Sequence, residues 1–293
     1  MIGPAIKSMR VHQWVKNSFV LAPLVFAREL DEPNARLHAG LAFLAFSLAA
    51  SCVYLVNDVL DAPSDRAHPV KRARPIASGA LPVPAALTLA AALLAGSYVA
   101  GWFAAPAVVA VTTAYLAQNV AYSLWLKRLP WLDVATIAVG FLLRLVAGAV
   151  AISVPLSPWI MACTFLLALY LGLGKRRHEL IADGQGGTRG RAVLGAYHPE
   201  RLRVVMLVVA LLTAIGYTQY TLAPGTVAAM GTRWLVLTIP FMLAGLWRFE
   251  ALSRDTNRAS SPTEAILTDA PFLLNLALWT ALVTALIYRP WQA

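Results

Sequence analysis

Charged residues are scarce in this chain. Only 13% of its 293 residues are Asp, Glu, Lys or Arg, whereas 59% are hydrophobic. A soluble globular domain carries roughly a quarter charged residues, so the composition excludes an ordinary soluble protein of one or two domains. Apolar runs of about 18 to 22 residues recur along nearly the whole length, and a helix needs about this length to cross a bilayer. The chain is therefore expected to be an integral membrane protein.

Cysteine and metal-type histidine patterns are also lacking. The two cysteines, Cys52 and Cys163, both lie inside apolar runs, so they are expected to be buried small hydrophobic residues rather than a disulfide or a metal pair. The histidines do not have the spacing of zinc ligands, which argues against a zinc site at His12, His68, His178 or His198.

Nine apolar runs are expected to form transmembrane helices, at residues 13–27, 37–57, 83–103, 106–126, 131–151, 157–174, 202–222, 233–249 and 271–289. Strands of a transmembrane barrel would alternate in hydropathy over about ten residues, whereas these runs are apolar on all faces. The expected fold class is all-α: a polytopic membrane protein with nine transmembrane helices around a cavity open to the cytoplasmic side.

The distribution of lysine and arginine predicts the orientation. If the N-terminus is inside, 19 of the 24 cationic residues fall in inner segments, four fall outside, and Arg144 lies in the middle of the fifth span. Cationic loops resist translocation, so the N-terminus is expected in the cytoplasm and the C-terminus outside. The net charge of +10 then lies beside anionic headgroups and phosphates, and no nucleic-acid partner is needed to explain it.

Two of the expected cytoplasmic loops are long, at about 58–82 and 175–201. They follow the second and the sixth span, and these matching positions predict a bundle whose two long loops face one cavity. All of residues 1–293 are expected to form a single transmembrane domain. The stretch DGQGGTRG at 183–190 is rich in glycine and is expected to be a mobile loop.

A cluster of acidic residues stands at the inner end of the second span. On a helix, Asp58, Asp61 and Asp65 would lie within about 60° of one another on one face. Three clustered carboxylates repel one another unless a cation neutralises them. Oxygen ligands, including the amide of Asn57, select a hard ion such as Mg²⁺, which commonly binds one or two protein carboxylates, water and substrate phosphates.

The same residues have a simpler interpretation as a solvated loop, in which the carboxylates balance nearby cations. Against it stands the order of the charges, because the acids are followed within ten residues by Arg66, Lys71, Arg72 and Arg74. Metal-binding acids beside phosphate-binding bases suit a metal diphosphate. Pro63 complicates the helical geometry, since it deprives one carbonyl of its partner and is expected to kink the helix.

The stretch NDVLDAPSDRAHPVKRARPIASG, which begins at Asn57, contains the pattern N-D-x-x-D-x-x-x-D. It resembles the signature of the UbiA-type intramembrane prenyltransferase superfamily, and the resemblance extends over essentially the full chain. Membership would imply a nine-helix membrane fold that handles polyprenyl substrates with Mg²⁺.

Ordinary members of that superfamily transfer a prenyl group from a prenyl diphosphate and carry a second aspartate-rich motif after the sixth span. This chain has GKRRHEL at 174–180 instead, so cations stand where further metal ligands would be expected. This substitution resembles the decaprenyl-phosphate phosphoribosyltransferase branch of the superfamily. RVHQWVKN at 10–17, SLAASCVYLVNDV at 47–59 and LLRLVAGAV at 142–150 carry the same resemblance.

That branch attaches 5-phosphoribose, taken from phosphoribosyl pyrophosphate (PRPP), to a polyprenyl phosphate such as decaprenyl phosphate. Its product leads to the arabinan of actinobacterial cell-wall arabinogalactan. The resemblance implies Mg²⁺ as cofactor, PRPP and a polyprenyl phosphate as partners, and a bacterial plasma membrane as location. The oligomeric state stays open, with a homo-oligomer among the alternatives.

The resemblance also implies roles for individual residues. The expected metal ligands are Asn57, Asp58, Asp61 and Asp65, and the three aspartates are the expected catalytic residues. The residues expected to bind PRPP are Lys16, Asn17, Arg66, Lys71, Arg72, Arg74, Lys175, Arg176 and Glu179. Those expected at the lipid phosphate are Tyr122, Lys127, Arg144 and Arg177.

Several of these residues have structural alternatives. Lys16 would extend its ammonium group to the interface in any membrane helix, and positive-inside anchoring explains Lys127 equally well. A guanidinium in mid-membrane needs a partner or a wet cavity, so Arg144 is either a phosphate ligand or half of a structural pair. Asp133 lies too far along the same helix to be that partner. Glu264 and Asp269 are expected at a helix start rather than in catalysis.

Two other functions compete with phosphoribosyl transfer. One is transfer of a prenyl group from a prenyl diphosphate to another acceptor, which the missing second aspartate motif argues against. The other is a transporter or lipid-binding scaffold, in which the buried charges line a path rather than a reaction centre. A transporter is expected to show paired broken helices at mid-membrane, and the sequence shows no convincing pair.

Overall fold

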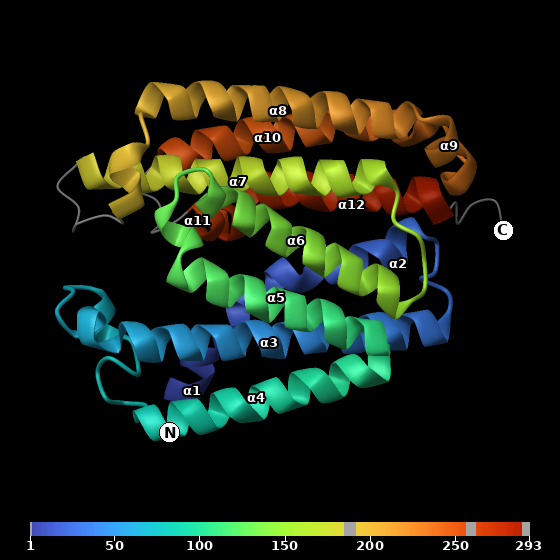
Figure 1. Cartoon of the computed structure of the whole chain (residues 1–293). Coiled ribbons are helices and arrows are strands. Elements are labelled where there is room, and N and C mark those ends of the chain that lie inside the picture. Colours follow the sequence, from blue (N-terminus) through green and yellow to red (C-terminus); the bar gives the residue numbers. More distant parts are fainter. Residues whose placement is uncertain (1, 185–191, 256–261, 289–293) are drawn as a thin grey trace. The chain divides into compact units, whose positions relative to one another are not determined.

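The computed structural model describes residues 2–184, 192–255 and 262–288 of the chain. Within these ranges every regular element is a helix and none is a strand, which confirms the all-α prediction (Figure 1). The chain divides into two compact units. Unit 1 comprises Met1–Val25, Glu29–Leu124 and Leu143–Pro155, and unit 2 comprises Phe26–Arg28, Trp125–Leu142 and Leu156–Ala293.

Eight helical segments of the described residues are long and apolar enough to cross a membrane. They are α3 (Pro33–Arg66), α4 (Val83–Ala104), α5 (Pro106–Leu124), α6 (Leu132–Ala151), α7 (Pro158–Gly184), α8 (Pro199–Leu222), η5 with α10 (Trp234–Thr238 and Ile239–Arg254) and α12 (Ala270–Tyr288). The shorter helices are α1 (Ile2–Met9), η1 (Val11–Leu21), α2 (Ala22–Phe26), η2 (Lys71–Ala73), η3 (Leu126–Arg128), η4 (Ala192–Ala196), α9 (Pro224–Met230) and α11 (Pro262–Thr268). The predicted count of nine is not confirmed.

The missing ninth span is the first one, at 13–27. Instead of one long α-helix, the structure has the eleven-residue 3-10 helix η1 followed by the five-residue α2. At about 2.0 Å per residue for the first piece and 1.5 Å for the second, the two together reach roughly 30 Å. This reach matches the hydrocarbon thickness of a bilayer, although neither piece is a helix of 18 residues.

The side chains of η1 explain its form. Trp14 and Asn17 donate hydrogen bonds to Ser51 (2.9 Å) and Ser47 (3.0 Å) of α3, and Val20 is buried in the same core as Phe46. Trp14, Asn17 and Val20 are three residues apart. A 3-10 helix has three residues per turn, so side chains at this spacing stand directly above one another. The 3-10 form therefore turns all three toward α3.

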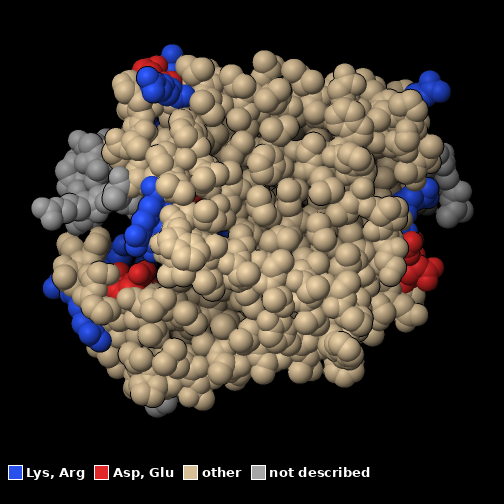
Figure 2. Space-filling view, viewed as in Figure 1, with Lys and Arg blue, Asp and Glu red and all other residues tan. Residues whose placement is uncertain are grey.

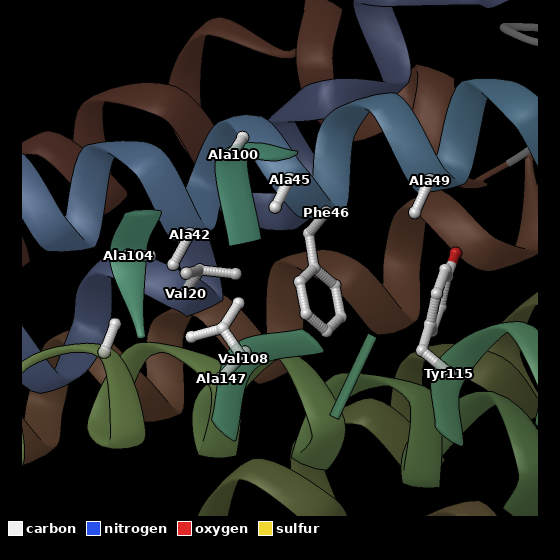
Figure 3. Close-up of a cluster of buried hydrophobic side chains, with 11 residues drawn as sticks. Val20, Ala42, Ala45, Phe46, Ala49, Ala100, Ala104, Val108, Tyr115 and Ala147 are labelled. Carbon is white, nitrogen blue, oxygen red and sulfur yellow. The ribbon is translucent and has the colours of Figure 1, made fainter. Parts of the chain in front are cut away.

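Small side chains let the helices of unit 1 pack closely. Figure 3 shows Phe46 in the centre of a core that includes Val20, Val108 and Tyr115, with alanines of α3, α4 and α6 around it. The α3 and α4 helices lie side by side (Figure 1), and the hydroxyl of Ser97 donates to the Ala45 carbonyl at 2.7 Å. Close backbone approach through small residues is the usual way in which helices associate in lipid.

Two helices extend into the predicted cytoplasmic loops. α3 continues to Arg66, so residues 58–66 of the expected loop 58–82 are helical in spite of Pro63. α7 continues to Gly184, through the first part of the expected loop 175–201. The ends of both helices carry polar side chains that bond to protein partners, described below. Most of the glycine-rich stretch 183–190 lies outside the described residues.

Unit 2 has its own apolar core, in which Leu173, Leu202 and Phe249 are buried between α7, α8 and α10. The predicted helix-start role of Asp269 is confirmed, because its carboxylate accepts the N–H of Phe272 at 2.9 Å at the beginning of α12. Glu264, predicted with it, has no described side chain.

The exposed surfaces of the long helices are apolar. Large hydrophobic side chains such as Trp102, Leu211 and Trp247 are more than half exposed. On the face drawn in Figure 2, the charged side chains gather near helix ends and the long flanks carry almost none. A broad apolar surface of this kind is expected to face lipid.

Gly148 of α6 offers a test of the packing in unit 1. A Cβ atom at this position would clash with the carbonyl oxygen of Val20 in η1. We expect Gly148→Ala to lower the free energy of unfolding by about 1–3 kcal/mol, because neither backbone can move freely. The measurement is the thermal unfolding midpoint of the purified protein in detergent.

Gly40→Ala is the matched control, since a Cβ atom on Gly40 of α3 would meet no atom within 4 Å. We expect it to raise stability slightly, because alanine favours a helix over glycine. Equal midpoints for the two variants would contradict the close approach of η1 and α6.

Candidate functional site

Two of the three predicted aspartates lie together at the end of α3. Asp58 and Asp65 are 4% and 3% exposed, whereas Asp61 is exposed. Seven residues along a helix return a side chain to within about 20° of the same direction, whereas a step of three leaves it about 60° away. The helix geometry therefore explains why Asp58 and Asp65 share a buried position and Asp61 does not.

The length of α3 places this pair beyond the apolar part of the helix. At 1.5 Å per residue its 34 residues span about 51 Å, whereas the hydrocarbon core of a bilayer is about 30 Å thick. The acidic end of α3 therefore reaches the membrane interface.

Two arginines neutralise the buried pair. One guanidinium nitrogen of Arg74 lies 3.2 Å from Asp58 Oδ1 and 2.7 Å from Asp65 Oδ2, so it joins the two carboxylates. Arg10 donates to the same Asp58 Oδ1 at 2.6 Å. Both arginine side chains are about 30% exposed. The two carboxylates thus converge around positive charge, and in this structure that charge comes from Arg10 and Arg74.

Arg10 has an unusual backbone. Its φ and ψ of 52° and 48° are left-handed, at the junction where α1 ends and η1 begins. This conformation costs a residue with a side chain roughly 1–2 kcal/mol. The Arg10 guanidinium lies over the ring of Tyr54 at 5.0 Å, in addition to its bond to Asp58. These two contacts of the side chain help to hold the strained backbone.

The other predicted residues of this segment lie around the pair. Asn57 Oδ1 accepts a hydrogen bond from the Ser123 hydroxyl at 3.1 Å, and Arg66 donates to the carbonyl of Ala77 at 3.2 Å. Lys71 and Arg72 of η2 are exposed. The end of α3 therefore carries an exposed carboxylate, a buried carboxylate pair and exposed cations within one short stretch of chain.

Arg144 is buried in unit 1 and is held by uncharged side chains. It donates to Asn17 Oδ1 at 2.7 Å and to the Tyr115 hydroxyl at 3.1 Å, and its guanidinium lies 4.8 Å from the Tyr115 ring centre. Asn17 in turn donates to Ser47. Lys16, on the next position of η1, is half-buried. The structure thus provides Arg144 with polar protein partners, as the structural alternative requires. Its role at a lipid phosphate stays a prediction.

Unit 2 contains an ion-pair network around a fully buried arginine. The Arg176 side chain is 0% exposed and donates to Asp133 Oδ2 at 2.6 Å and to Glu179. The Tyr197 hydroxyl donates to the other oxygen of Asp133 and accepts the N–H of Trp131 at 2.9 Å. Burial raises the pKa of Tyr197, and the bond to Asp133 raises it further, so the hydroxyl keeps its proton. Arg176 is thereby turned into the protein, and donor binding by it stays a prediction.

The other predicted ligands lie toward the C-terminal end of α7, or on η3 and α5. Arg177 pairs with Glu250 of α10 at 2.6 Å, and Lys175 is half-buried. Glu179, at 25% exposure, is the most accessible member of the Arg176 network. Lys127 lies on η3 and is half-buried. Tyr122, predicted with it, is half-buried on α5 of unit 1.

Comparison with known proteins agrees with the motif. The model of the UbiA prenyltransferase family matches residues 18–276. The chain belongs to the UbiA prenyltransferase family. It is 34% identical to the decaprenyl-phosphate phosphoribosyltransferase of Mycolicibacterium smegmatis, over 98% of this chain and 93% of the relative. It is 33% identical to the decaprenyl-phosphate phosphoribosyltransferase of Corynebacterium glutamicum, over 97% of this chain and 86% of the relative.

Solved structures of the UbiA family share the fold. A UbiA homolog from Archaeoglobus fulgidus bound to GPP and Mg²⁺ superposes with a TM-score of 0.70 at 19% identity, covering 98% of each chain. A UbiA homolog from Aeropyrum pernix K1 gives a TM-score of 0.66 at 18% identity, covering 95% of this chain and 96% of that one. With eight apolar helices of membrane length among its described residues and this family membership, the chain is a multi-pass membrane protein.

The site fits the divalent cation that a UbiA-family enzyme implies, through two carboxylates. Among the described residues, no three His, Cys, Asp or Glu side chains are grouped so that they could hold a metal ion. Mg²⁺ needs only one or two protein carboxylates, since water and substrate phosphate complete its shell. Oxygens of Asp58 and Asp65 already share one nitrogen of Arg74, so they converge on a point where a cation is held.

Three charged residues of these clusters form ion pairs that were not predicted from the sequence. No role was predicted for Arg10, although it lies in the RVHQWVKN motif, and neither Asp133 nor Glu250 was predicted to pair with the arginines of α7. Asp133 and Glu250 are single acids near otherwise apolar segments. That pattern is a signal for a buried pair, because an acid at the edge of a membrane helix needs a cation.

The Arg176 network predicts a large stability effect. Asp133→Ala removes one of the two carboxylates that pair with the fully buried Arg176 guanidinium, which is expected to cost about 3–5 kcal/mol of unfolding free energy. The unfolding midpoint in detergent measures the loss.

Glu200→Gln is the control. It breaks the pair of Glu200 with Arg203, whose side chains are more than half exposed, and such pairs contribute at most about 1 kcal/mol. A variant at Asp133 that unfolds no earlier than the control would show that Arg176 does not depend on this carboxylate.

Proposed function

We propose that the protein transfers 5-phosphoribose from PRPP to a polyprenyl phosphate, with a divalent cation such as Mg²⁺, and releases pyrophosphate. The observation that carries this proposal is the end of α3, where the Asp58 and Asp65 carboxylates converge beside exposed cations. The two relatives named decaprenyl-phosphate phosphoribosyltransferase support it, because they are similar over nearly the whole chain.

The donor carries two kinds of negative charge, a diphosphate and a separate 5-phosphate. Asp58 and Asp65, with Asp61 and Asn57 beside them, would hold the cation, which neutralises the diphosphate as it leaves. Lys71 and Arg72 are exposed, and we propose that they donate hydrogen bonds to phosphate oxygens of the donor. The other predicted donor ligands remain predictions: Lys16, Asn17, Arg66, Arg74, Lys175, Arg176 and Glu179.

The acceptor needs no general base. The second pKa of a phosphate monoester is near 6, so the lipid phosphate is already a dianion at neutral pH. Its oxygen attacks C1 of the ribose, and the bond from C1 to the pyrophosphate oxygen breaks with both electrons going to pyrophosphate. Inversion at C1 is the expected outcome. Arg144, Arg177, Lys127 and Tyr122 stay predicted ligands of the lipid phosphate.

The whole chain, residues 1–293, is proposed to act as one membrane domain. We propose a bacterial plasma membrane as its location, with the N-terminus in the cytoplasm and the C-terminus outside, because 19 cationic residues then stay inside and four lie outside.

The transfer can be tested with purified protein, radiolabelled PRPP, Mg²⁺ and decaprenyl phosphate. Lipid-linked phosphoribose is the expected product. Transfer from a prenyl diphosphate alone would instead favour an ordinary prenyltransferase. Absence of both products in a folded protein would favour a lipid-binding scaffold or transporter.

Asp61 tests the metal-binding role without disturbing the core. Its side chain is exposed, so Asp61→Asn is expected to insert and fold like the wild type, while phosphoribosyl transfer falls by at least about 100-fold. The rate of transfer at saturating PRPP and Mg²⁺ measures the loss.

Asp31→Asn provides the comparison, because Asp31 is an exposed acid between α2 and α3. Its transfer rate is expected to equal that of the wild type. Full activity in Asp61→Asn would remove this residue from the proposed site.

A further inference from the structure

Arg10 is the cation closest to the predicted metal ligands. Its guanidinium lies 2.6 Å from Asp58 Oδ1, and Arg74 also contacts this oxygen, at 3.2 Å. Asp58 is 4% exposed, so little water is available to screen these charges. The carboxylate that is best placed to bind a divalent ion is therefore already neutralised from two sides.

A divalent ion and Arg10 cannot both bind this oxygen at such distances. The repulsion between a guanidinium and a doubly charged ion a few ångströms apart is strong near a protein surface, several kcal/mol for each unit charge at an effective dielectric of about 20. Arg10, which makes the shorter of the two arginine contacts to this oxygen, must therefore leave Asp58 when the ion arrives, and Arg74 must give way as well. A departing guanidinium needs a new anion, and a diphosphate bound to the same ion provides one.

The place of Arg10 in the chain suits such a movement. It stands between two separate helices, α1 and η1, and its own backbone is left-handed. Residues held in this strained conformation cluster at switch regions and ligand contacts. Loss of the bond to Asp58 would release part of the strain that the bond helps to maintain.

We propose that Arg10 acts as a resident counter-ion of Asp58, and that it moves from this carboxylate to the diphosphate of the donor when donor and divalent ion bind together. The proposal rests on the proposed function for the identity of the donor. It assigns Arg10 a role in the order of binding. The ion alone binds weakly because it must displace Arg10, and the ion with diphosphate binds tightly because Arg10 gains a partner.

The experiment measures Mn²⁺ binding to the full-length protein in detergent by electron paramagnetic resonance, without turnover. Arg10→Gln removes the competing charge and keeps a side chain of similar length. We expect it to bind Mn²⁺ alone roughly five- to tenfold more tightly than the wild type. With Mn²⁺ and inorganic pyrophosphate together, the variant is expected to bind Mn²⁺ no more tightly than the wild type, because its side chain at position 10 can no longer donate a charged hydrogen bond to the diphosphate.

Lys7→Gln is the matched control, since Lys7 is an exposed cation one turn away on α1 and its removal changes the net charge equally. Its Mn²⁺ affinity is expected to equal that of the wild type. If both variants tighten Mn²⁺ binding alike, the effect is one of net charge and the proposal is overturned. Unchanged affinity in a folded Arg10→Gln protein overturns it as well.

Arg10→Lys covers the case in which Arg10→Gln does not fold. Lysine keeps the charge but loses the planar fork and the contact with Tyr54, so we expect Mn²⁺ alone to bind roughly two- to threefold more tightly. Wild-type affinity in Arg10→Lys would then overturn the proposal.

The phosphoribosyl transfer assay on the same preparations separates this inference from the proposed function. If the wild type transfers phosphoribose normally and Arg10→Gln does not change Mn²⁺ binding, only the proposed role of Arg10 is contradicted. Tighter Mn²⁺ binding in the variant, together with transfer from a prenyl diphosphate and none from PRPP, supports the exchange and defeats the proposed donor.

Discussion

Neutralisation of buried carboxylates is the constraint on which this protein depends most. A charged group at the edge of a membrane has little water to stabilise it, so it must have a counter-charge. Asp58 and Asp65 meet that need through Arg10 and Arg74, and the chain around them is arranged accordingly. α3 extends past the apolar region to present the acids, and the turn after it returns Arg74 to them.

The same constraint shapes unit 2, with a different result. Arg176 is fully buried between Asp133 and Glu179, and Tyr197 completes the network with a proton that it retains. The arginines that neutralise Asp58 and Asp65 are partly exposed, so this carboxylate pair can exchange its counter-charge. A fully buried arginine that is paired with two carboxylates is expected to hold its helix in place. The two clusters thus contain similar residues and differ in their access to solvent.

The sequence predicted the parts of the structure that depend on length and on local order. Apolar runs of membrane length became helices, and the i, i+7 spacing of Asp58 and Asp65 brought them to one face. The partners could not be predicted, because Arg10 and Asp58 are distant in sequence and meet only through the packing of η1 on α3. The helical form of 11–21 was missed for a related reason: hydropathy does not distinguish a 3-10 helix from an α-helix.

The three-residue repeat of η1 makes its register unusually strict. Each added residue would rotate everything after it by about a third of a turn, so a single insertion would swing Asn17 away from Arg144 and Val20 out of the core. An insertion of three residues would restore the directions but shift them along α3 by about 6 Å. Evolution can therefore change the composition of this segment more easily than its length.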